Sequence, residues 1–518
     1  MMVITAWGIC ALAGLGCSEH SAERRPHVFL IVVDTLRADS LHDPAGLVNT
    51  LNIDALAADG IVFPNTFAHA PITLPSHMAL FTSRLPYDTG VLNNGQTVPS
   101  RYPMVAEWLN EYGYDTRAVI SLATLSFLGQ NGVLRGFDEF DARSKQLVNA
   151  DKVETRLNKS LEDYDGDAPL FMFAHFSDPH EPYNDHGHDP REGEILVDGQ
   201  MVGSTSISDP HLFKKEIELD AGTHTVELRS DTSFQPRLVA LYQKGKQSAP
   251  TWEEGEPLKV TKYVRVSIDT PVNKNSTYTL HVWMNQALSP EQVQQRYIRE
   301  VEFVDEYIGR FIDNLKRRGL YEDSIIIFTS DHGEGLGERK GFIGHVENLS
   351  DSLIHVPLII RLPKGHPRAD ELRAKSDSLV SHISLVPTIL DLVSVPEMPN
   401  QKGMSLLGET SGVHLAETHT PQARSNLFCL RDTNYKLVYL ADDDQFEMFD
   451  LQADPEELTN VFAEKRGERD AWPEQLRSIA ALAADRTPSE GELSPEAQQQ
   501  LTALGYIDSK KPSKPLDR

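Results

Sequence analysis

Basic residues are scarce in this chain of 518 residues, which has 49 Lys and Arg against 76 Asp and Glu and a net charge of −27. Such an excess of acid excludes binding to nucleic acid or to an anionic membrane through general charge. An anionic substrate would instead need local positive charge, from a metal ion or from clustered His and Arg. We expect most of the acidic groups to form a solvated surface.

Long apolar runs are also scarce, and the N-terminal one is too short for a comfortable membrane-spanning helix. Residues 1–17 carry no charge and are mostly apolar or small, which predicts a secretory signal. Leu15-Gly16-Cys17-Ser18 resembles a bacterial lipoprotein cleavage site, where Cys17 would be acylated. We therefore expect an exported protein, periplasmic or at the cell surface, that meets a membrane only through this lipid. The alternative is a frayed N-terminus of a cytosolic protein.

Cysteine is equally scarce, with three residues in the whole chain. Cys10 would be removed with the signal and Cys17 would carry the lipid, which leaves Cys429 alone. A disulfide framework is then excluded.

What the sequence does contain is an alternation of apolar strands and amphipathic helices. Continuous apolar runs at residues 27–33, 170–176 and 324–328 predict buried central strands, and further strands are expected at 115–120 and 356–361. Helices are expected at residues 52–58, 102–112, 289–318 and 379–395. This alternation predicts an α/β fold, a mainly parallel sheet flanked by helices on both faces.

The sequence pattern changes between residues 189 and 287, where short strand-like segments alternate with turns. We interpret this stretch as an inserted β-sandwich module, which is either a lid over the site or a passive surface module. The expected organisation is a signal and linker at 1–23, an α/β domain in two parts at 24–188 and 288–410, the module at 189–287, and a small C-terminal α+β subdomain with a tail at 411–518.

Residues 70–82 (APITLPSHMALFT) form a polar turn that runs into a short apolar helix. Pro75 suits the first turn of a helix, so Thr73 is expected at or just before the N-terminus. The free N–H groups and partial positive charge at that end suit an anionic ester. A Thr at this place is also a common helix cap.

Polar side chains follow three predicted strands, namely Asp34, the pair Asp178 and His180, and the pair Asp331 and His332. Carboxyl ends of parallel strands share one edge of a sheet, which the Thr73 loop can reach. Asp34, Thr73, Asp331 and His332 then form a shell for a divalent metal, which activates the hydroxyl as a nucleophile. The imidazole favours Mn²⁺ or Zn²⁺, with Ca²⁺ as the further option. His180 and His345 would bind the oxyanion, protonate the leaving oxygen or hold a second metal.

Several motifs resemble the sulfatase family of the alkaline phosphatase superfamily. They are VVDTLRADSL at 32–41, APITLPSHMALFTSRLP at 70–86, FSDPHEPY at 176–183, FTSDHGEGLGE at 328–338 and MFDLQADPEELTN at 448–460. The resemblance implies an alkaline phosphatase-like fold with a metal at the carboxyl edge of the sheet. It implies metal binding by Asp34, Asp331 and His332, a nucleophile at Thr73, and substrate contacts from Asn94 and His180. His345 lies near a position where the family has Lys or His, and His77 is the further residue that we expect to bind substrate.

Two departures from the family pattern bear on the chemistry. Most characterised sulfatases have a Cys or Ser that is oxidised to formylglycine where this chain has Thr73, and an Arg where it has His77. Thr35 also replaces the second Asp of the usual pair. The chain is thus similar to Thr-nucleophile relatives such as nucleotide pyrophosphatases and phosphoethanolamine or lipoteichoic-acid transferases. A Thr ester must be hydrolysed by attack at sulfur or phosphorus, whereas formylglycine hydrate releases sulfate by elimination.

The sequence therefore predicts an exported, metal-dependent hydrolase of sulfate or phosphate esters of small molecules or glycans, with Thr73 as the nucleophile. Two alternatives stay open. One is a transferase that passes a phospho-group to an envelope glycan or lipid. The other is a catalytically inactive relative that binds a glycan.

Overall fold

The computed structural model describes residues 25–485 apart from 42–47, 127–131, 143–147, 185, 187–190, 208–212, 244–251, 254–260, 271–275, 287, 340 and 421–424. The expected signal, Cys17 and the expected C-terminal tail lie outside these described residues. Among the helices of the described ranges, none has the length and apolar character needed to span a bilayer.

A seven-stranded sheet forms the centre of the fold, in the order β2-β17-β14-β1-β6-β4-β5. Strands β14, β1, β6, β4 and β5 are parallel, while β17 is antiparallel to both of its neighbours. The bounds are β1 (His27–Val33), β2 (Ile61–Val62), β4 (Asp115–Ile120), β5 (Glu139–Asp141), β6 (Leu170–Phe176), β14 (Ser324–Thr329) and β17 (Leu358–Arg361). The predicted mainly parallel α/β sheet is confirmed, and β1, β4 and β6 have the predicted limits.

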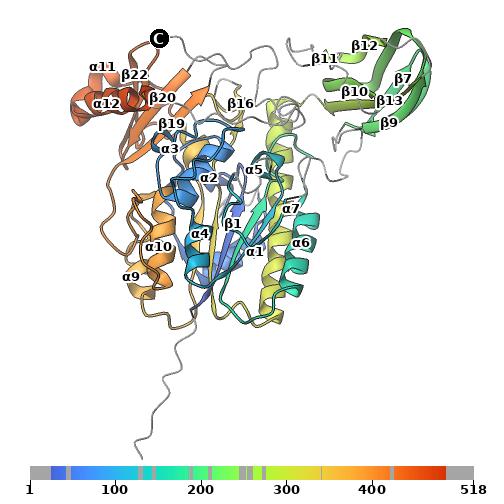
Figure 1. The fold of residues 1–518 in the computed structure, drawn as a ribbon. Coiled ribbons are helices and arrows are strands. Elements are labelled where there is room, and N and C mark those ends of the chain that lie inside the picture. The colour runs from blue at the N-terminus through green and yellow to red at the C-terminus, as the bar shows by residue number, and fades with distance from the viewer. Residues whose placement is uncertain are drawn as a thin grey trace, which may run out of the picture.

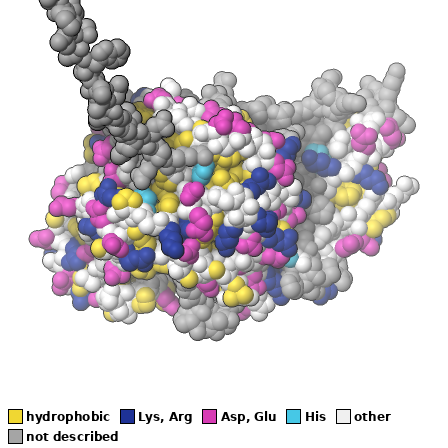
Figure 2. Space-filling view, turned by 90° about the horizontal axis from the view of Figure 1, so that it is seen from below, with side chains coloured by type: hydrophobic (Ala, Val, Ile, Leu, Met, Phe, Trp, Pro, Cys, Tyr) yellow, Lys and Arg dark blue, Asp and Glu magenta, His cyan; other side chains and the backbone are white. Residues whose placement is uncertain are grey.

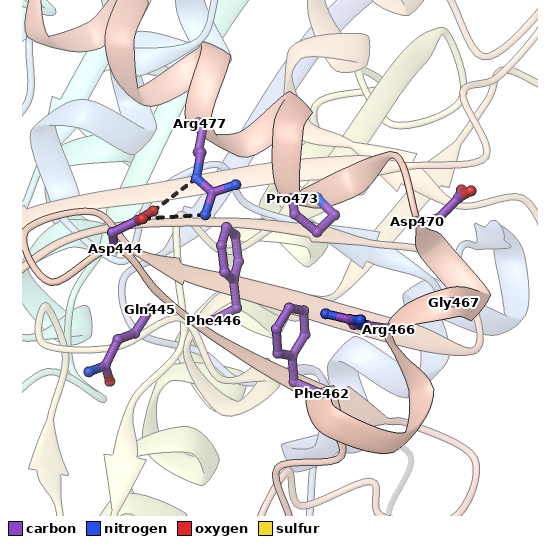
Figure 3. Close-up of a pocket in the computed structure, with 9 residues that line it drawn as sticks. All are labelled: Asp444, Gln445, Phe446, Phe462, Arg466, Gly467, Asp470, Pro473 and Arg477. Carbon is purple, nitrogen blue, oxygen red and sulfur yellow. Dashed lines mark hydrogen bonds and ion pairs between the residues drawn. The ribbon is translucent and has the colours of Figure 1, made fainter.

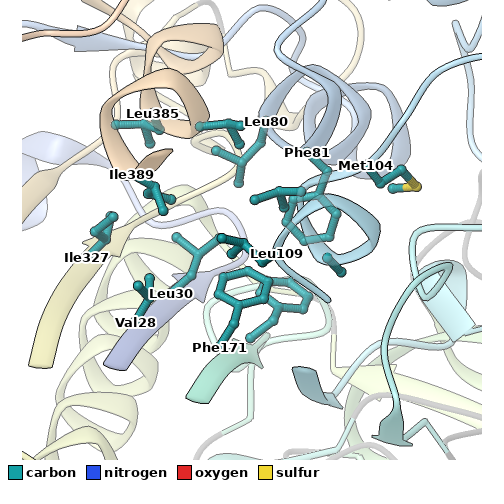
Figure 4. Close-up of a cluster of buried hydrophobic side chains, with 14 of the residues drawn as sticks. Val28, Leu30, Leu80, Phe81, Met104, Leu109, Phe171, Ile327, Leu385 and Ile389 are labelled. Carbon is teal, nitrogen blue, oxygen red and sulfur yellow. The ribbon is translucent and has the colours of Figure 1, made fainter. Parts of the chain in front are cut away.

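Helices cover both faces of this sheet (Figure 1), because the side chains of β1 alternate between two cores. Val28, Leu30 and Val32 pack with α2 (Thr73–Thr82), α4 (Val105–Glu111) and α10 (Leu385–Leu392), as Figure 4 shows in part. Phe29, Ile31 and Val33 pack with α1 (Leu51–Asp59), α6 (Ala150–Glu162) and α7 (Pro290–Arg317). Each buried side chain of this size stabilises the fold by roughly 1.5–3 kcal/mol, so both faces favour apolar residues. Short helices complete these layers, namely α3 (Pro86–Thr89), α5 (Ala123–Ser126), α8 (Asp351–Ile354) and α9 (Ala369–Arg373).

The helix expected at residues 379–395 is shorter in the structure. Val380–Ser381 form β18, which pairs in parallel with β3 (Thr66–Phe67), and α10 begins only at Leu385. The Val380 N–H donates to the carbonyl oxygen of Asn65 at 2.8 Å, so the strand pairing takes a backbone group that a helix would have used. A second small pair, β15 (Gly335–Leu336) with β16 (Ile343–Gly344), lies in the loop after β14.

A separate sheet of seven strands is inserted between β6 and α7 and lies to one side of the central sheet in Figure 1. Its strands are β7 (Glu192–Val197), β8 (Gln200–Ser206), β9 (Phe213–Leu219), β10 (Gly222–Gln243), β11 (Trp252–Glu253), β12 (Thr261–Thr270) and β13 (Ser276–Gln286). The long β10 pairs with β7 and β12 in its first half and with β13 in its second. The side chains of both halves of β10 share one hydrophobic core, in which Val226 and Leu228 pack among residues such as Leu280 and Val282.

In its described residues, the C-terminal subdomain has a four-stranded antiparallel sheet and two α-helices. Its elements are β19 (His414–Thr420), β20 (Ser425–Arg431), β21 (Tyr435–Leu440), β22 (Gln445–Asp450), α11 (Phe462–Lys465) and α12 (Trp472–Ala484). One face of the sheet packs on Phe67 and Leu353 of the α/β domain, and the other packs on α12.

Charged side chains of both signs are interspersed on the face shown in Figure 2. On this face the acidic side chains are thus spread among the basic ones rather than gathered at one place. This pattern is typical of a solvated surface.

Candidate active site

A strained turn directly after β1 is hydrogen-bonded to the residues that follow β14. Asp34 follows β1 directly, and Thr35 has a φ of 59°, a left-handed conformation that is costly for a β-branched residue. The Thr35 N–H donates to Asp331 Oδ1 at 3.3 Å, and its hydroxyl donates to the Asp34 carbonyl oxygen at 2.7 Å. The turn thereby holds the carboxylates of Asp34 and Asp331 next to each other.

Thr73 is the first residue of α2, as predicted, but it does not cap the helix. Ile72 is the N-cap residue, and Thr73 Oγ1 is buried without a hydrogen-bond partner. The first turn of α2 is fixed to the end of β14, because Ser76 Oγ donates to the Asp331 carbonyl oxygen at 2.6 Å. His77 Nδ1 lies 2.8 Å from the Thr73 carbonyl oxygen and 3.5 Å from Asp331 Oδ2.

Asp34, Asp331 and His332 each present one possible metal-ligating atom, and these atoms lie within 4.8 Å of one another. His332 Nε2 is 3.7 Å from Asp34 Oδ1 and 3.5 Å from Asp331 Oδ2. Both oxygens of Asp34, together with Asp331 Oδ2 and His332 Nε2, are buried without a hydrogen-bond partner. Buried polar atoms are normally satisfied, and a divalent ion would satisfy all four. This donor set therefore fits a divalent metal, and His332 Nδ1, 2.9 Å from the Gly333 carbonyl oxygen, is oriented for that role.

His180 and His345 lie beside this group of ligands. Their ring centroids are 5.1 Å apart, and the His345 ring is 4.5 Å from that of His332. His345 Nδ1 is 3.0 Å from Glu334 Oε1. Within the described part of the chain, neither His180 nor His345 belongs to a group of three closely spaced metal-ligating side chains.

Asn94 also reaches the start of α2, where its Oδ1 accepts a hydrogen bond from Leu74 N at 2.9 Å. Its Nδ2 is buried without a partner and so has N–H groups to offer a ligand. Asp178 has a different place. Its Oδ1 accepts from Ala150 N at 2.9 Å, so this carboxyl supports the N-terminus of α6 and is not part of the metal-ligating group.

Two residues at the site were given no role by the sequence analysis, namely His175 and Glu334. His175 lies in β6, with Nε2 at 3.8 Å from Asp34 Oδ2 and Nδ1 at 2.9 Å from Ser121 Oγ. The sequence does contain a sign of this role, because His175 is the only ionisable residue in the apolar run of residues 170–176. Glu334 lies within the SDHGE motif and pairs with His345.

Burial controls the protonation of the site. It lowers the pKa of His332 to about 3 and the pKa values of His180 and His345 to about 4, so the three imidazoles are neutral at pH 7. Burial, reinforced by Asp331, raises the pKa of Asp34 well above its usual range, and burial raises the pKa of Asp331 to about 6. Neutral imidazoles are good metal ligands, and a nearby cation favours the ionised carboxylates.

A separate cavity of about 700 Å³ lies in the C-terminal subdomain, between β22, α11 and α12. The rings of Phe446 and Phe462 line it next to Arg466, and Arg477 is bonded to Asp444 at its edge (Figure 3). The predicted site residues do not line this cavity, so it is distinct from the candidate active site.

The mainly parallel sheet with helices on both faces is that of an α/β enzyme with an alkaline phosphatase-like fold, and the group of possible metal ligands lies at its carboxyl edge. The chain belongs to the sulfatase family, whose model matches residues 26–395. A second model, the C-terminal region of N-sulphoglucosamine sulphohydrolase, matches residues 347–477. The enzyme is accordingly a sulfatase-like sulfuric ester hydrolase.

Curated relatives agree with this assignment, and solved structures agree with the fold. The chain is 24% identical over 500 residues to N-acetylglucosamine-6-O-sulfatase of Bacteroides thetaiotaomicron, covering 88% of this chain and 86% of that protein. It resembles a solved structure in complex with its substrate D-glucosamine-2-N,6-O-disulfate, with a TM-score of 0.60, 18% identity and coverage of 90% and 100%. It also resembles a phosphonate monoester hydrolase of Agrobacterium radiobacter, with a TM-score of 0.60, 21% identity and coverage of 91% and 99%.

Proposed function

We propose that this chain is a metal-dependent hydrolase of sulfate or phosphate-type esters in which Thr73 is the nucleophile. The observation that carries this proposal is the buried, unbonded hydroxyl of Thr73 at the N-terminus of α2. That helix end is joined through His77 to Asp331, one of the three grouped metal-ligating residues. The imidazole of His332 favours Mn²⁺ or Zn²⁺, and Ca²⁺ is the further candidate.

The residues of this chain have separate tasks in the reaction. A divalent ion held by Asp34, Asp331 and His332 would lower the pKa of a nearby hydroxyl and offset the negative charge of the ester. Thr73 Oγ forms a bond to sulfur or phosphorus while the bond to the leaving oxygen breaks. The neutral imidazole of His180 or His345 takes up the proton that Thr73 loses and then gives it to the leaving oxygen, so the protons balance. Water then cleaves the Thr ester, which restores the hydroxyl and releases sulfate or phosphate.

Two of the similar proteins support a proposal for the substrate class. One similar protein is an N-acetylglucosamine-6-O-sulfatase, and one similar structure holds a sulfated glucosamine. We propose a sulfated or phosphorylated sugar, or a small ester of the same kind, as the substrate. A phosphonate or phosphate ester is the alternative that the plain Thr favours, because the Thr ester must be hydrolysed by direct attack.

The test is hydrolysis of matched aryl sulfate, aryl phosphate, phosphodiester and phosphonate esters by metal-stripped protein refilled with Mn²⁺, Zn²⁺ or Ca²⁺. Thr73→Ala should lower kcat by a factor on the order of 10³ or more with its metal still bound, while Thr73→Ser keeps a hydroxyl and part of the activity. Thr82→Ala is the matched control, because Thr82 lies on the same helix and its hydroxyl bonds only to the Met78 carbonyl oxygen. Full activity of metal-loaded Thr73→Ala would refute the nucleophile. Transfer to an added alcohol instead of water would identify a transferase.

We also propose that the chain is exported and anchored through a lipid on Cys17. The support is the sequence of residues 1–18 alone, which ends in Leu-Gly-Cys-Ser. Expressed in a bacterium, the wild type should sediment with membranes and take up labelled fatty acid. Cys17→Ala should lose both properties while its hydrolase activity persists, and an unlabelled wild type in the soluble fraction would contradict the anchor.

A further inference from the structure

The two carboxylate oxygens of Asp34 face two different histidines. Oδ1 lies 3.7 Å from His332 Nε2, and Oδ2 lies 3.8 Å from His175 Nε2. These separations exceed hydrogen-bond length. Two atoms that ligate one tetrahedral ion at about 2.1 Å each lie roughly 3.4 Å apart. The distance from each Asp34 oxygen to the facing histidine Nε2 is therefore about the distance expected between two ligands of the same ion.

Asp331 also lies between two histidines. Its Oδ2 is 3.5 Å from His332 Nε2, and the ring of His77 lies on its other side, with Nδ1 as the nearer nitrogen at 3.5 Å. His77, His175 and Asp331 form a second group whose ligating atoms all lie within 4.8 Å of one another, and all three residues are fully buried. The two groups of ligands thus meet at Asp331, with Asp34 also between them.

The two additional histidines are oriented as metal-binding histidines usually are. His175 Nδ1 is 2.9 Å from Ser121 Oγ, and His77 Nδ1 is 2.8 Å from the Thr73 carbonyl oxygen. The Nε2 atoms of both rings are buried without a hydrogen-bond partner. A partner at one ring nitrogen fixes the ring and leaves the other nitrogen free to ligate. Phe173 packs against both rings at 5.8 and 6.0 Å and closes this side with apolar surface.

We propose that the enzyme holds a second divalent cation, at His77, His175 and Asp331, with Asp34 and Asp331 shared with the first. The inference rests on the proposed function only for the first ion at His332. Two imidazoles with carboxylate favour Zn²⁺ or Mn²⁺ over Ca²⁺ and Mg²⁺. Shared carboxylates hold paired ions roughly 3.5–4 Å apart.

The first measurement is metal content, by elemental analysis of full-length protein stripped and refilled with Mn²⁺. The wild type should hold two ions per chain, and His175→Ala should hold one. Ser121→Ala removes only the orienting partner and should weaken the binding of one ion by about 10–100-fold. His419→Ala is the matched control, because His419 is a buried histidine paired with Glu417 in the C-terminal sheet, and it should keep both ions.

The second measurement is the electron paramagnetic resonance spectrum of the Mn²⁺-loaded proteins. Two Mn²⁺ ions bridged by carboxylates give a coupled multiline signal, so we expect it in the wild type and a six-line signal of isolated Mn²⁺ in His175→Ala. One ion per chain with a six-line signal in the wild type, or two ions in both proteins, overturns the second site. If the wild type holds one ion that His332→Ala loses, only this inference fails. If it holds none, the metal of the proposed function fails as well.

Discussion

Replacing Lys436 by Met tests how the C-terminal subdomain is fastened to the α/β domain. Lys436 is fully buried in β21, and its Nζ donates to the Leu349 carbonyl oxygen at 2.8 Å, to Asp351 Oδ1 at 2.5 Å and to Glu457 Oε1 at 2.8 Å. Met has a similar length and keeps the apolar contacts of the side chain. The change therefore removes one positive charge and leaves the two carboxylates.

The magnitude follows from what stays behind. Removing one partner of a buried ion pair typically costs about 3–5 kcal/mol, because the other charge is left uncompensated. Arg431 still contacts Asp351 at 3.0 Å, and Arg339 lies 3.8 Å from Glu457, so part of the compensation survives. We therefore expect a loss at the lower end, about 3 kcal/mol in the free energy of unfolding.

Urea unfolding followed by circular dichroism measures this loss, with Lys465→Met as the control. Lys465 also faces a carboxylate, Asp450 at 3.5 Å, but its side chain is 42% exposed, and surface pairs contribute little. A Lys436→Met protein within about 0.5 kcal/mol of the wild type would refute the reasoning, since that is the range of ordinary surface substitutions.

Three further predictions concern the α/β domain. Burial, with Glu300 nearby, raises the pKa of Asp178 to about 8, whereas the ordinary pKa of Asp is 3.8. The protonated carboxyl therefore contributes its full stability below pH 3.8, and this contribution is lost as the pH rises through 8. Asp178→Asn should thus unfold at higher urea concentration than the wild type at pH 9 and at a similar concentration at pH 4; equal midpoints at pH 9 would contradict this. At Gly333 a Cβ would lie 2.0 Å from the Ser352 carbonyl oxygen, whereas at Gly412 it would meet nothing within 4 Å. Gly333→Ala should therefore lower both metal content and stability, while Gly412→Ala changes neither, and two indistinguishable proteins would count against the close approach. The Tyr297 hydroxyl makes two hydrogen bonds of 2.9 Å to the loop after β1, one to a backbone carbonyl and one from a backbone N–H. Tyr297→Phe removes both and should lower the free energy of unfolding, measured in urea, by about 1–3 kcal/mol. An unchanged urea midpoint would disprove this.

The central strands were predictable because their residues are buried on both faces. The apolar runs at 27–33 and 170–176 became β1 and β6 with the predicted limits. The same logic brought Asp34, Asp331 and His332 to one edge, since each follows a parallel strand. Pro75 restricts the backbone to the first turn of a helix, which placed Thr73 at the start of α2.

Other features depend on contacts that local sequence does not encode. His175 reads as a core residue of an apolar strand, and only the register of β6 beside β1, with Val32 opposite His175, brings it near Asp34. β10 runs without a break through residues 229–233, although polar residues interrupt its apolar pattern there. Pairing with three neighbouring strands along its length makes it continuous. α10 begins late because residues 380–381 pair with β3, a contact between distant segments.

The order of the central sheet has a consequence for how the chain is made. β14 lies between β1 and β17, and His27 at the start of β1 pairs with Ser324. During synthesis β1 therefore keeps one hydrogen-bonding edge open until the inserted sheet and α7 have been completed. Open apolar strand edges invite pairing with other chains, and distant pairing slows folding. The newly made enzyme is thus expected to depend on chaperones until β14 arrives and closes that edge.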